Sequence, residues 1–283
     1  MNQVGNTPAV LLAIAGFDPS GGAGIAADLK TFAAHNCYGV AAITAITVQS
    51  TRGVQRLEAT PAELLRAQLE HLLADVTVAG VKIGMLATRA NVDVVASLLE
   101  HKKFPCVVLD PVLRSSSGFE LLEARAWKEL SRRLLKLATV ITPNVAEAAA
   151  LAGLEVRDEA SMRAAAQKLV ELGARAVVIT GGHLAKPVDL LYDGKEFLPF
   201  SSERVRSEST HGSGCTFSSA ITANLALGRQ LPDAVMLAKA YVARAIEKGF
   251  AIGKGPGPLD HFHRFHQEHS YRVSAPVAAE HLR

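Results

Sequence analysis

Short apolar runs alternate along the chain with longer segments in which apolar positions recur at a helical spacing. The runs are rich in Val and Ile and do not alternate strictly between apolar and polar residues, which is typical of strands buried on both faces. The predicted strands are Ala9–Phe17, Val40–Val48, Gly80–Leu86, Cys106–Leu109, Val140–Thr142 and Ala176–Thr180. The predicted helices between them are Ile25–His35, Pro61–Asp75, Arg89–Glu100, Ala124–Leu137, Val145–Ala152 and Ser161–Leu172. This alternation predicts an α/β fold with a mostly parallel sheet and helices on both of its faces.

The C-terminal third has a different pattern. A hairpin is predicted over Leu190–Pro199, with its turn at Asp193-Gly194. Two helices follow, Cys215–Leu227 and Asp233–Lys248, and their many Ala and Leu residues indicate that both are largely buried. No linker rich in Pro, Ser or Gly interrupts the chain, so a single domain over residues 1–270 is predicted. Residues 271–283 are expected to form a poorly ordered tail.

Composition and charge exclude several classes of protein. The formal net charge is +3, the basic residues are scattered and only 5% of residues are aromatic, so no nucleic-acid surface is expected. No apolar run reaches the roughly 20 residues that span a bilayer. The run Ala9–Phe17 lacks the basic residue and the cleavage pattern of a signal peptide. The three cysteines form no CxxC pair, which argues against a disulfide framework or a zinc knuckle and favours a reducing cytoplasm.

Polar or glycine-rich turns follow most of the predicted strands. They are Asp18–Gly24, Gln49-Ser50, Met85, Asp110-Pro111, Thr142–Asn144 and Thr180–Gly182. Ligands of open parallel sheets bind at the carboxyl ends of the strands. The turns are therefore predicted to meet at one rim and to form a ligand site there.

The segment HGSGCT at His211–Thr216 opens an apolar helix. Gly212 and Gly214 allow the backbone to approach a ligand closely, and with Ser213 they place unpaired N–H groups at the helix start, which is an anion site. Cys215 falls in the first turn, where the helix dipole favours a thiolate that could act as general base or nucleophile. The alternative is a loop whose cysteine only packs.

Two further interpretations concern the glycine-rich turn after the first strand and the start of the helix that follows it. Gly22-x-Gly24-x-x-Ala27 matches the dinucleotide fingerprint formally, but no Asp or Glu stands near Gln49 to hold a ribose, so a nicotinamide-dependent oxidoreductase is not favoured. Asp28 lies one turn inside the predicted helix. Its side chain could point back to the strand ends, or it could be an acid that the helix dipole favours.

Acidic residues at two strand ends indicate a cation site. Asp110 directly follows a strand, where a carboxylate is well placed for Mg²⁺ or its coordinated water. Asn144 and Glu147 share one face of a helix start that faces the same rim. The alternative for this pair is a capping box.

Lysines and histidines elsewhere rank lower. Lys82 and Lys186 could touch phosphates or lie on the surface, and Lys239 is more suggestive because its helix is largely apolar. A histidine cluster occurs near the C-terminus, without cysteine or acidic ligands in register, so a metal site is not favoured there. It comprises His261, His263, His266 and His269. No Walker motif occurs anywhere in the chain.

Taken together in order, these segments resemble a known family. The specific stretches are AGFDPSGGAGIAADLKTF at Ala15–Phe32, ITAITVQST at Ile43–Thr51, VKIGML at Val81–Leu86, LDPV at Leu109–Val112, TPNVAEA at Thr142–Ala148, ITGGH at Ile179–His183 and HGSGCTFSSAI at His211–Ile221. They are similar to the hydroxymethylpyrimidine/phosphomethylpyrimidine kinases of thiamin biosynthesis, within the ribokinase superfamily. The resemblance runs from Val10 to His263.

The resemblance implies a ribokinase-like three-layer αβα sandwich with a central, mostly parallel sheet and a small lid, usually paired as a homodimer. It implies that ATP and Mg²⁺ are the cofactors. It also implies two reactions, phosphorylation of 4-amino-5-hydroxymethyl-2-methylpyrimidine and then of its monophosphate. The implied location is the cytoplasm. A pyridoxal or pyridoxine kinase on the same fold is the alternative, and a binding protein without turnover is another.

The resemblance also implies roles for single residues. On the pyrimidine side these are Asp28, Gln49 and Met85, with Val112 close by. Gly212, Ser213, Gly214 and Cys215 would form the anion hole, and Cys215 would be the general base. Asp110, Asn144 and Glu147 would serve Mg²⁺ and the phosphates, with Asp110 and Glu147 at the metal, and Lys239 would lie on the nucleotide side.

The chain departs from the family pattern at two positions on the nucleotide side. Where the family often has a lysine after Asp-Pro-Val, this chain reads Leu113-Arg114-Ser115-Ser116-Ser117-Gly118, and Arg114 is the candidate replacement. Where many members have lysine before Gly-Gly-His, it has Thr180.

Overall fold

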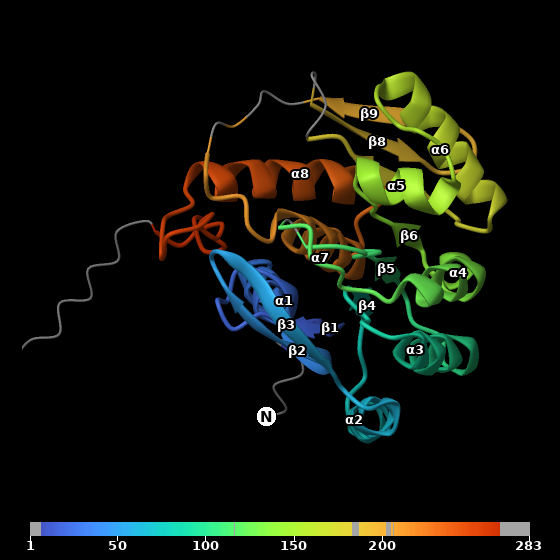
Figure 1. The fold of residues 1–283 in the computed structure, drawn as a ribbon, viewed down its shortest axis with the longest axis vertical. Coiled ribbons are helices and arrows are strands. Elements are labelled where there is room, and N and C mark those ends of the chain that lie inside the picture. Colours follow the sequence, from blue (N-terminus) through green and yellow to red (C-terminus); the bar gives the residue numbers. More distant parts are fainter. Residues whose placement is uncertain (1–6, 116, 183–186, 202–204, 206, 267–283) are drawn as a thin grey trace, which may run out of the picture.

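The structure, a computed structural model, describes residues 7–115, 117–182, 187–201, 205 and 207–266. Within these residues one nine-stranded sheet runs through the molecule in the order β3-β2-β1-β4-β5-β6-β7-β8-β9 (Figure 1). The strands are β1 Val10–Phe17, β2 Tyr38–Ser50, β3 Gly53–Ala59, β4 Gly80–Ile83, β5 Val107–Leu109, β6 Val140–Ile141, β7 Val177–Thr180, β8 Val188–Tyr192 and β9 Phe197–Ser201. Neighbours from β2 to β7 are parallel, and β3, β8 and β9 join antiparallel. The prediction of a mostly parallel α/β sheet is confirmed.

Helices cover both faces of this sheet, with α1, α7 and α8 on one side and α2 to α6 on the other (Figure 1). They are α1 Gly24–Ala34, α2 Ala62–Asp75, α3 Arg89–His101, α4 Ala124–Arg133, α5 Val145–Ala152, α6 Glu159–Glu171, α7 Ser213–Ala226 and α8 Leu231–Glu247. Each predicted helix is present. The helix predicted to run to Leu137 ends earlier, at Arg133, and a single 3-10 turn over Leu135–Leu137 follows it.

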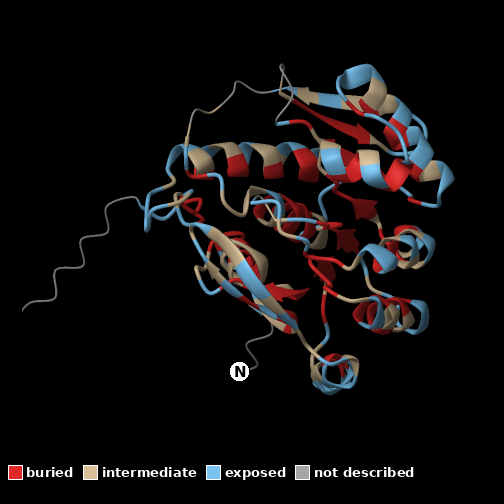
Figure 2. Cartoon of the chain, viewed as in Figure 1, coloured by how far each residue is buried: buried red, intermediate tan, exposed pale blue. Residues whose placement is uncertain are grey.

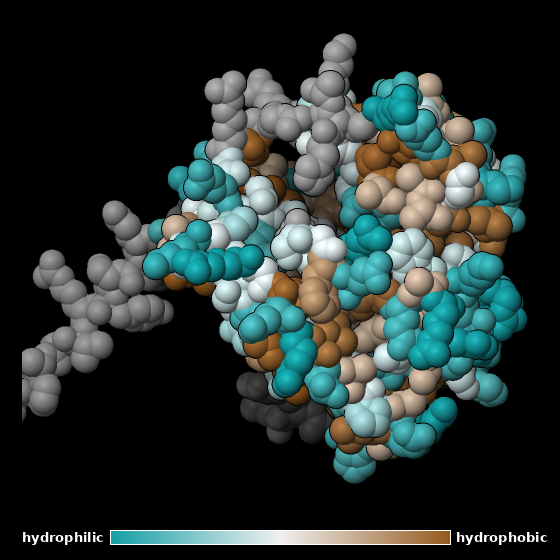
Figure 3. Space-filling model, viewed as in Figure 1, coloured by the Kyte–Doolittle hydropathy of each residue, from teal (hydrophilic) through white to brown (hydrophobic). Residues whose placement is uncertain are grey.

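The hydrophobic core lies in two layers, one on each face of the sheet. Leu65 and Leu69 of α2 pack in one layer, and Phe217 and Ile221 of α7 in the other. Figure 2 shows buried residues along the sheet and on the helix faces that contact it, with exposed residues on the outer faces. Figure 3 shows that apolar residues also reach the surface, in small areas between polar ones.

Helix α7 differs from the other helices because it is buried on every side over residues 216–224. Buried there are the hydroxyl-bearing Ser218, Ser219 and Thr222 as well as apolar residues. A helix buried all round is usually apolar. Buried hydroxyl groups need hydrogen-bond partners inside the protein, so these side chains must be bonded to neighbouring elements or to the helix itself.

The edge strand β3 is absent from the sequence-based prediction. Its residues Gln55, Arg56 and Glu58 are exposed and interrupt any apolar run. β2 pairs with β1 only as far as Ile46, and beyond that point it continues in the β2–β3 hairpin to Ser50. This hairpin extends past the end of β1.

Several sequence-based expectations concern the ends of the chain and its surface. The predicted tail 271–283, Lys186, His183 and His269 lie outside the described residues. Cys37, Cys106 and Cys215 are all free thiols. Across the ranges that the structure describes, no helix is both long enough and apolar enough to cross a membrane.

Candidate active site

The turns at the carboxyl ends of the parallel strands meet at one rim, as the pattern of polar strand ends predicts. His211, just before α7, connects two of them. Its Nε2 lies 2.8 Å from Oδ2 of Asp18, which follows β1, and 3.3 Å from Nε2 of Gln49 at the end of β2. These contacts join segments that are more than 160 residues apart in the chain.

The two glycine-rich turns are in direct backbone contact. Gly212 is the N-cap of α7 with a φ of +85°, and a Cβ there would overlap the carbonyl oxygen of Gly22. Any other residue at position 212 is therefore both strained and too large. Among the described residues, the N–H groups of Gly214 and Cys215 have no hydrogen-bond acceptor, whereas the N–H of Ser213 donates to Thr210. These free donors support the predicted anion site at the helix start.

The prediction that the helix dipole holds Cys215 as a thiolate is wrong for the site that the protein builds. Burial raises the pKa of the Cys215 thiol to about 12; the positive charge of Lys82 lowers it, but Asp110 and Asp28 raise it further. Loss of hydration and two nearby carboxylates therefore outweigh the dipole. The raised pKa favours the protonated thiol at neutral pH, and the side chain is half-buried.

Asp110 and Glu147 are two buried carboxylates on adjacent strand ends. Oδ2 of Asp110 accepts a hydrogen bond from Ser218 Oγ at 3.2 Å. The capping-box interpretation of the Asn144–Glu147 pair is confirmed. The pair forms a capping box at α5, with Glu147 N donating to Asn144 Oδ1 (3.0 Å) and Asn144 N donating to Glu147 Oε2 (2.9 Å). Burial, with Asp110 nearby, also raises the pKa of Glu147 to about 8.

These two carboxylates fit Mg²⁺. The negative charge of Asp110 opposes ionisation of Glu147. A cation bound between the two carboxylates would remove this repulsion. Across the described ranges, no three His, Cys, Asp or Glu side chains gather into an all-protein metal site. Mg²⁺ in kinase sites needs no such cage, since one or two carboxylates hold it together with water and substrate phosphates.

The residues that the resemblance assigns to the nucleotide side make contacts at the ends of β6, β7 and β8. Lys239 Nζ lies 2.6 Å from Oδ2 of Asp189, whose other oxygen accepts from Gly181 N at 3.0 Å. Thr180 pairs with Asn144 across an isolated bridge. Asp189 is a residue that the sequence interpretation missed, because an acid inside a hairpin strand carries no motif.

Arg114, the candidate replacement for the lysine that the family often has, is paired with an acidic residue on the surface. Its Nη2 lies 3.2 Å from Oε1 of Glu120, and both side chains are more than half exposed, at 58% and 61%. The guanidinium is therefore held on the surface of a short turn.

The residues that the resemblance assigns to the pyrimidine include an amide, Gln49, and two members of an apolar cluster, Met85 and Val112. Met85 packs with Ala45 and Leu121, and Val112 lies against them. Gly16 makes room for Met85, because a Cβ at position 16 would overlap the Met85 methyl group. The cluster provides an apolar wall, and the Gln49 amide provides a hydrogen-bond donor and acceptor.

The expectation that Asp28 contacts a substrate directly is not supported by its position. Asp28 is completely buried, with an exposed fraction of 0%. Its oxygens are bonded to Lys82 Nζ at 2.9 and 3.1 Å and to Ser219 Oγ at 2.7 Å. The side chain is thus inside the protein, beneath α7.

Lys82 and Asp18 are functional candidates that the sequence interpretation missed or misplaced. Lys82 is neither on the surface nor open to a phosphate, since its exposed fraction is 0%. The sequence signal that could have indicated its burial is its place in the apolar strand segment VKIG.

Asp18 accepts from the N–H groups of Ser20 (2.8 Å) and Ala23 (3.0 Å) as well as contacting His211, so it organises the glycine-rich turn. Burial raises the pKa of Asp18, but the hydrogen bonds from His211 and Ser20 lower it more.

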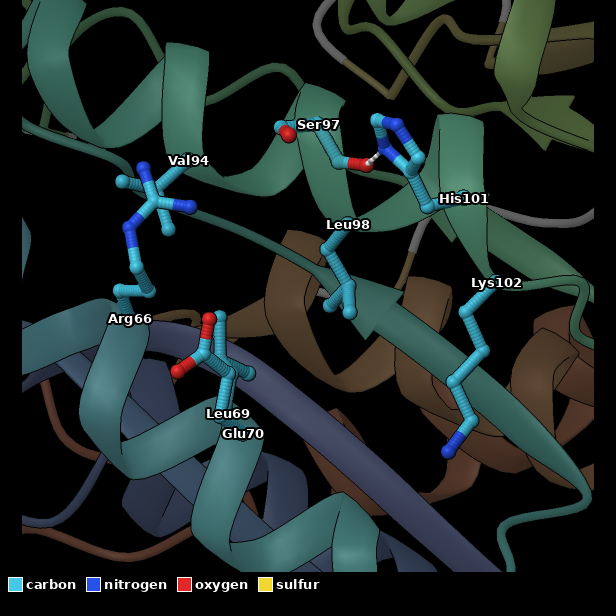
Figure 4. A pocket seen from close by; sticks show the side chains of 8 residues that line it. All are labelled: Arg66, Leu69, Glu70, Val94, Ser97, Leu98, His101 and Lys102. Atoms are coloured by element: carbon cyan, nitrogen blue, oxygen red, sulfur yellow. Dashed lines mark hydrogen bonds between the residues drawn. The ribbon is translucent and has the colours of Figure 1, made fainter.

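A hollow elsewhere on the surface is not part of this site. It lies between α2 and α3, has a volume of about 280 Å³, and shares no residue with the rim (Figure 4). Its lining residues are Arg66, Leu69, Glu70, Val94, Ser97, Leu98, His101 and Lys102. Two of the C-terminal histidines, His261 and His266, contact residues of the fold. His261 Nε2 lies 3.1 Å from Thr216 Oγ1, and His266 Nε2 lies 2.9 Å from Asp260.

Comparison with known proteins agrees with this geometry. A sequence model described as phosphomethylpyrimidine kinase matches residues 18–260. The hydroxymethylpyrimidine/phosphomethylpyrimidine kinase of Streptomyces coelicolor is 46% identical over 256 residues, which cover 90% of this chain and 95% of that protein. The Bacillus subtilis pyridoxal kinase, solved as an ADP complex, has a TM-score of 0.85 at 39% identity and covers 91% of this chain and 99% of its own. A phosphomethylpyrimidine kinase from Clostridium difficile has a TM-score of 0.76 at 39% identity, with coverages of 84% and 99%.

The raised pKa of Cys215 predicts a slow thiol. The rate of alkylation of Cys215 by iodoacetamide should rise about tenfold per pH unit from pH 7 to pH 10 without levelling off, because only the thiolate reacts. Peptide mapping by mass spectrometry separates this cysteine from Cys37 and Cys106. A rate that levels off below pH 9 would show that the thiolate forms easily and would contradict the account.

The raised pKa of Glu147 predicts a dependence of stability on pH. The folded-state pKa of about 8 lies above the usual 4.5. The folded protein therefore holds this proton more tightly than the unfolded chain does. The stability that this provides is present below about pH 4.5 and is lost as the pH rises to about 8.

Glu147→Gln is the matched variant, because glutamine also serves in a capping box and carries no charge. Between pH 5.5 and pH 8.5 the melting temperature of the wild type should fall further than that of Glu147→Gln. Parallel curves for the two proteins would exclude a raised pKa at this residue.

Proposed function

The chain belongs to the phosphomethylpyrimidine kinase family, and from this membership and the geometry of the rim we propose its reaction. It transfers the γ-phosphoryl group of ATP to the hydroxymethyl group of 4-amino-5-hydroxymethyl-2-methylpyrimidine, and then to the monophosphate that results. The observation that carries the proposal is the meeting of the free N–H groups of α7 with two buried carboxylates, Asp110 and Glu147, at the carboxyl ends of the strands.

Phosphoryl transfer needs in-line positioning and stabilisation of negative charge more than covalent chemistry. The N–H groups of Gly214 and Cys215 are placed to bind the oxygens of the phosphoryl group as charge develops on them. Asp110 and Glu147 would hold Mg²⁺, which when bound neutralises charge on the phosphates. Lys239, Thr180 and Asn144 lie on the nucleotide side of these carboxylates.

Cys215 acts in this proposal by passing a proton on rather than as a standing thiolate. Its thiol is half-buried at the rim, and the charges of Lys82 and Asp110 act on it in opposite directions. As the substrate hydroxyl attacks phosphorus, sulfur accepts the hydroxyl proton and the thiol proton passes to water at the rim, which leaves Asp110 ionised for Mg²⁺. A loose transition state makes a modest demand on the base, because the hydroxyl becomes acidic only as the new P–O bond forms.

Ring recognition falls to Gln49 and the apolar wall formed by Met85 and Val112. An amide offers a donor and an acceptor side by side, which matches the amino group and the ring nitrogen of an aminopyrimidine. Asp28 supports the site from beneath and does not contact the ring.

Pyridoxal phosphorylation is the alternative that a specific observation favours. The Bacillus subtilis pyridoxal kinase has a TM-score of 0.85 with this chain. A pyridoxal ring also carries a hydroxymethyl group beside hydrogen-bonding substituents, so the same wall and amide could hold it.

The assembly and location that the resemblance implies are part of the same proposal. A homodimer is supported by the exposed apolar residues Ile46 and Val48 on β2, at 56% and 45% exposure. A cytoplasmic location is supported by the three free cysteines.

The reaction is tested by incubating the protein with the free pyrimidine, ATP and Mg²⁺ and resolving monophosphate from diphosphate by chromatography. Both products should form in succession. The same protein should show a higher kcat/KM for the pyrimidine than for pyridoxal. A preference for pyridoxal would establish the alternative instead.

Replacing Cys215 should separate catalysis from binding. In Cys215→Ala we expect kcat to fall by about 10²- to 10⁴-fold, as for loss of a general base, while calorimetry shows little change in pyrimidine affinity. Cys106→Ala, which removes a buried thiol outside the site, is the control and should keep its activity. Full activity in Cys215→Ala would remove this residue from the mechanism.

A further inference from the structure

Two neighbouring serines of α7 are bonded to two different carboxylates. Ser219 Oγ donates to Asp28 Oδ1 on α1 at 2.7 Å. Ser218 Oγ lies 3.2 Å from Asp110 Oδ2, after β5. Consecutive helical residues point about 100° apart, because there are 3.6 residues per turn. Two such bonds therefore fix both the rotation of the helix and its position along its axis.

One ammonium group lies between the two carboxylates. Lys82 Nζ is 2.9 Å from Asp28 Oδ1 and 3.8 Å from Asp110 Oδ2. Lys82 extends from β4 in the middle of the sheet, and both it and Asp28 have an exposed fraction of 0%. A carboxylate pair buried this deeply would repel itself without the cation. The cluster thus joins β4, α1, α7 and the end of β5 in one place.

The cluster lies one helical turn from the anion site. Ser218 Oγ is 3.1 Å from the carbonyl oxygens of Gly214 and of Cys215. A shift at Ser218 is therefore carried directly to the backbone that presents the free N–H groups. Misplacement of a reacting group by about 1 Å can lower a rate by about a hundredfold.

We propose that Lys82 is a positioning residue for phosphoryl transfer. Its ammonium holds Asp28 and Asp110 together and, through Ser219 and Ser218, sets the N-terminus of α7 opposite Asp110. This role rests on the proposed kinase function of the rim and deepens it. If the cluster had only a structural role, its variants would lower stability and would change kcat only as far as the protein unfolds. Variants that affect stability and kcat differently therefore separate the positioning role from the structural role.

The first experiment removes one hydrogen bond of the cluster. Ser219→Ala breaks the link between α7 and Asp28, and Thr222→Val on the same helix removes a buried hydroxyl that donates only to the backbone of Ser218, at 2.8 Å. In Ser219→Ala we expect kcat to fall about tenfold or more with little change in the KM for the pyrimidine, whereas Thr222→Val should stay within about twofold of the wild type.

The outcomes of this experiment are distinct. If Ser219→Ala and Thr222→Val have the same kcat, the positioning role is wrong. If the wild type itself transfers no phosphate, the proposed function fails, which is a different result. In that case the affinity of each variant for ADP, measured by calorimetry, still tests the inference, because only Ser219→Ala should weaken the anion site.

The second experiment tests the charge of Lys82. Lys82→Met leaves two like charges buried and should lower both the melting temperature and kcat. Adding Asp28→Asn removes one of these charges and should restore most of the melting temperature. We expect kcat of the double variant to remain at least about tenfold below the wild type, because Lys82 no longer holds Asp110 in position against α7. Recovery of kcat together with the melting temperature would overturn the proposal.

Discussion

The burial of α7 on every side is the constraint on which the rest of this structure depends. A helix in that position cannot leave polar groups unpaired, so Ser218 and Ser219 are bonded to carboxylates inside the protein. Those carboxylates in turn need a cation, which Lys82 provides. The requirement to satisfy a buried helix therefore produces the charge cluster directly beneath the anion site.

Much of the architecture could be predicted from the sequence, because it depends on local patterns of apolar and polar residues. Buried parallel strands are short Val- and Ile-rich runs, and their polar ends, such as Asp110 and Gln49, indicated a common rim. The HGSGC helix start likewise has a local signature. The edge strand β3 escaped prediction because it is half exposed and its Gln55 and Arg56 resemble loop residues. Edge strands lack the apolar run that identifies a central one.

The positions of the charged side chains could not be predicted, since they depend on contacts between distant segments. Lys82 and Asp28 are 54 residues apart, and Ser219 and Asp28 are 191 apart. Asp28 was therefore expected at the substrate, and Lys82 on the surface or at a phosphate. The protonation of Cys215 was misjudged for the same reason. Its sequence position indicates the helix dipole, but only the fold shows the burial and the carboxylates that oppose it.

The raised pKa values of Glu147 and Cys215 have a common origin in burial, and nearby negative charge adds to both shifts. Asp28 and Asp110 lie at one buried ammonium, that of Lys82, and Glu147 lies close enough to Asp110 to be affected by its charge. Glu147 and Cys215 both respond by holding their protons, and Asp110 contributes to each shift. If the proposed function holds, these side chains meet a cation together with the nucleotide, and both pKa values should then fall. Ionisation of the site and binding of the phosphates would be coupled through charge, without any movement of the fold.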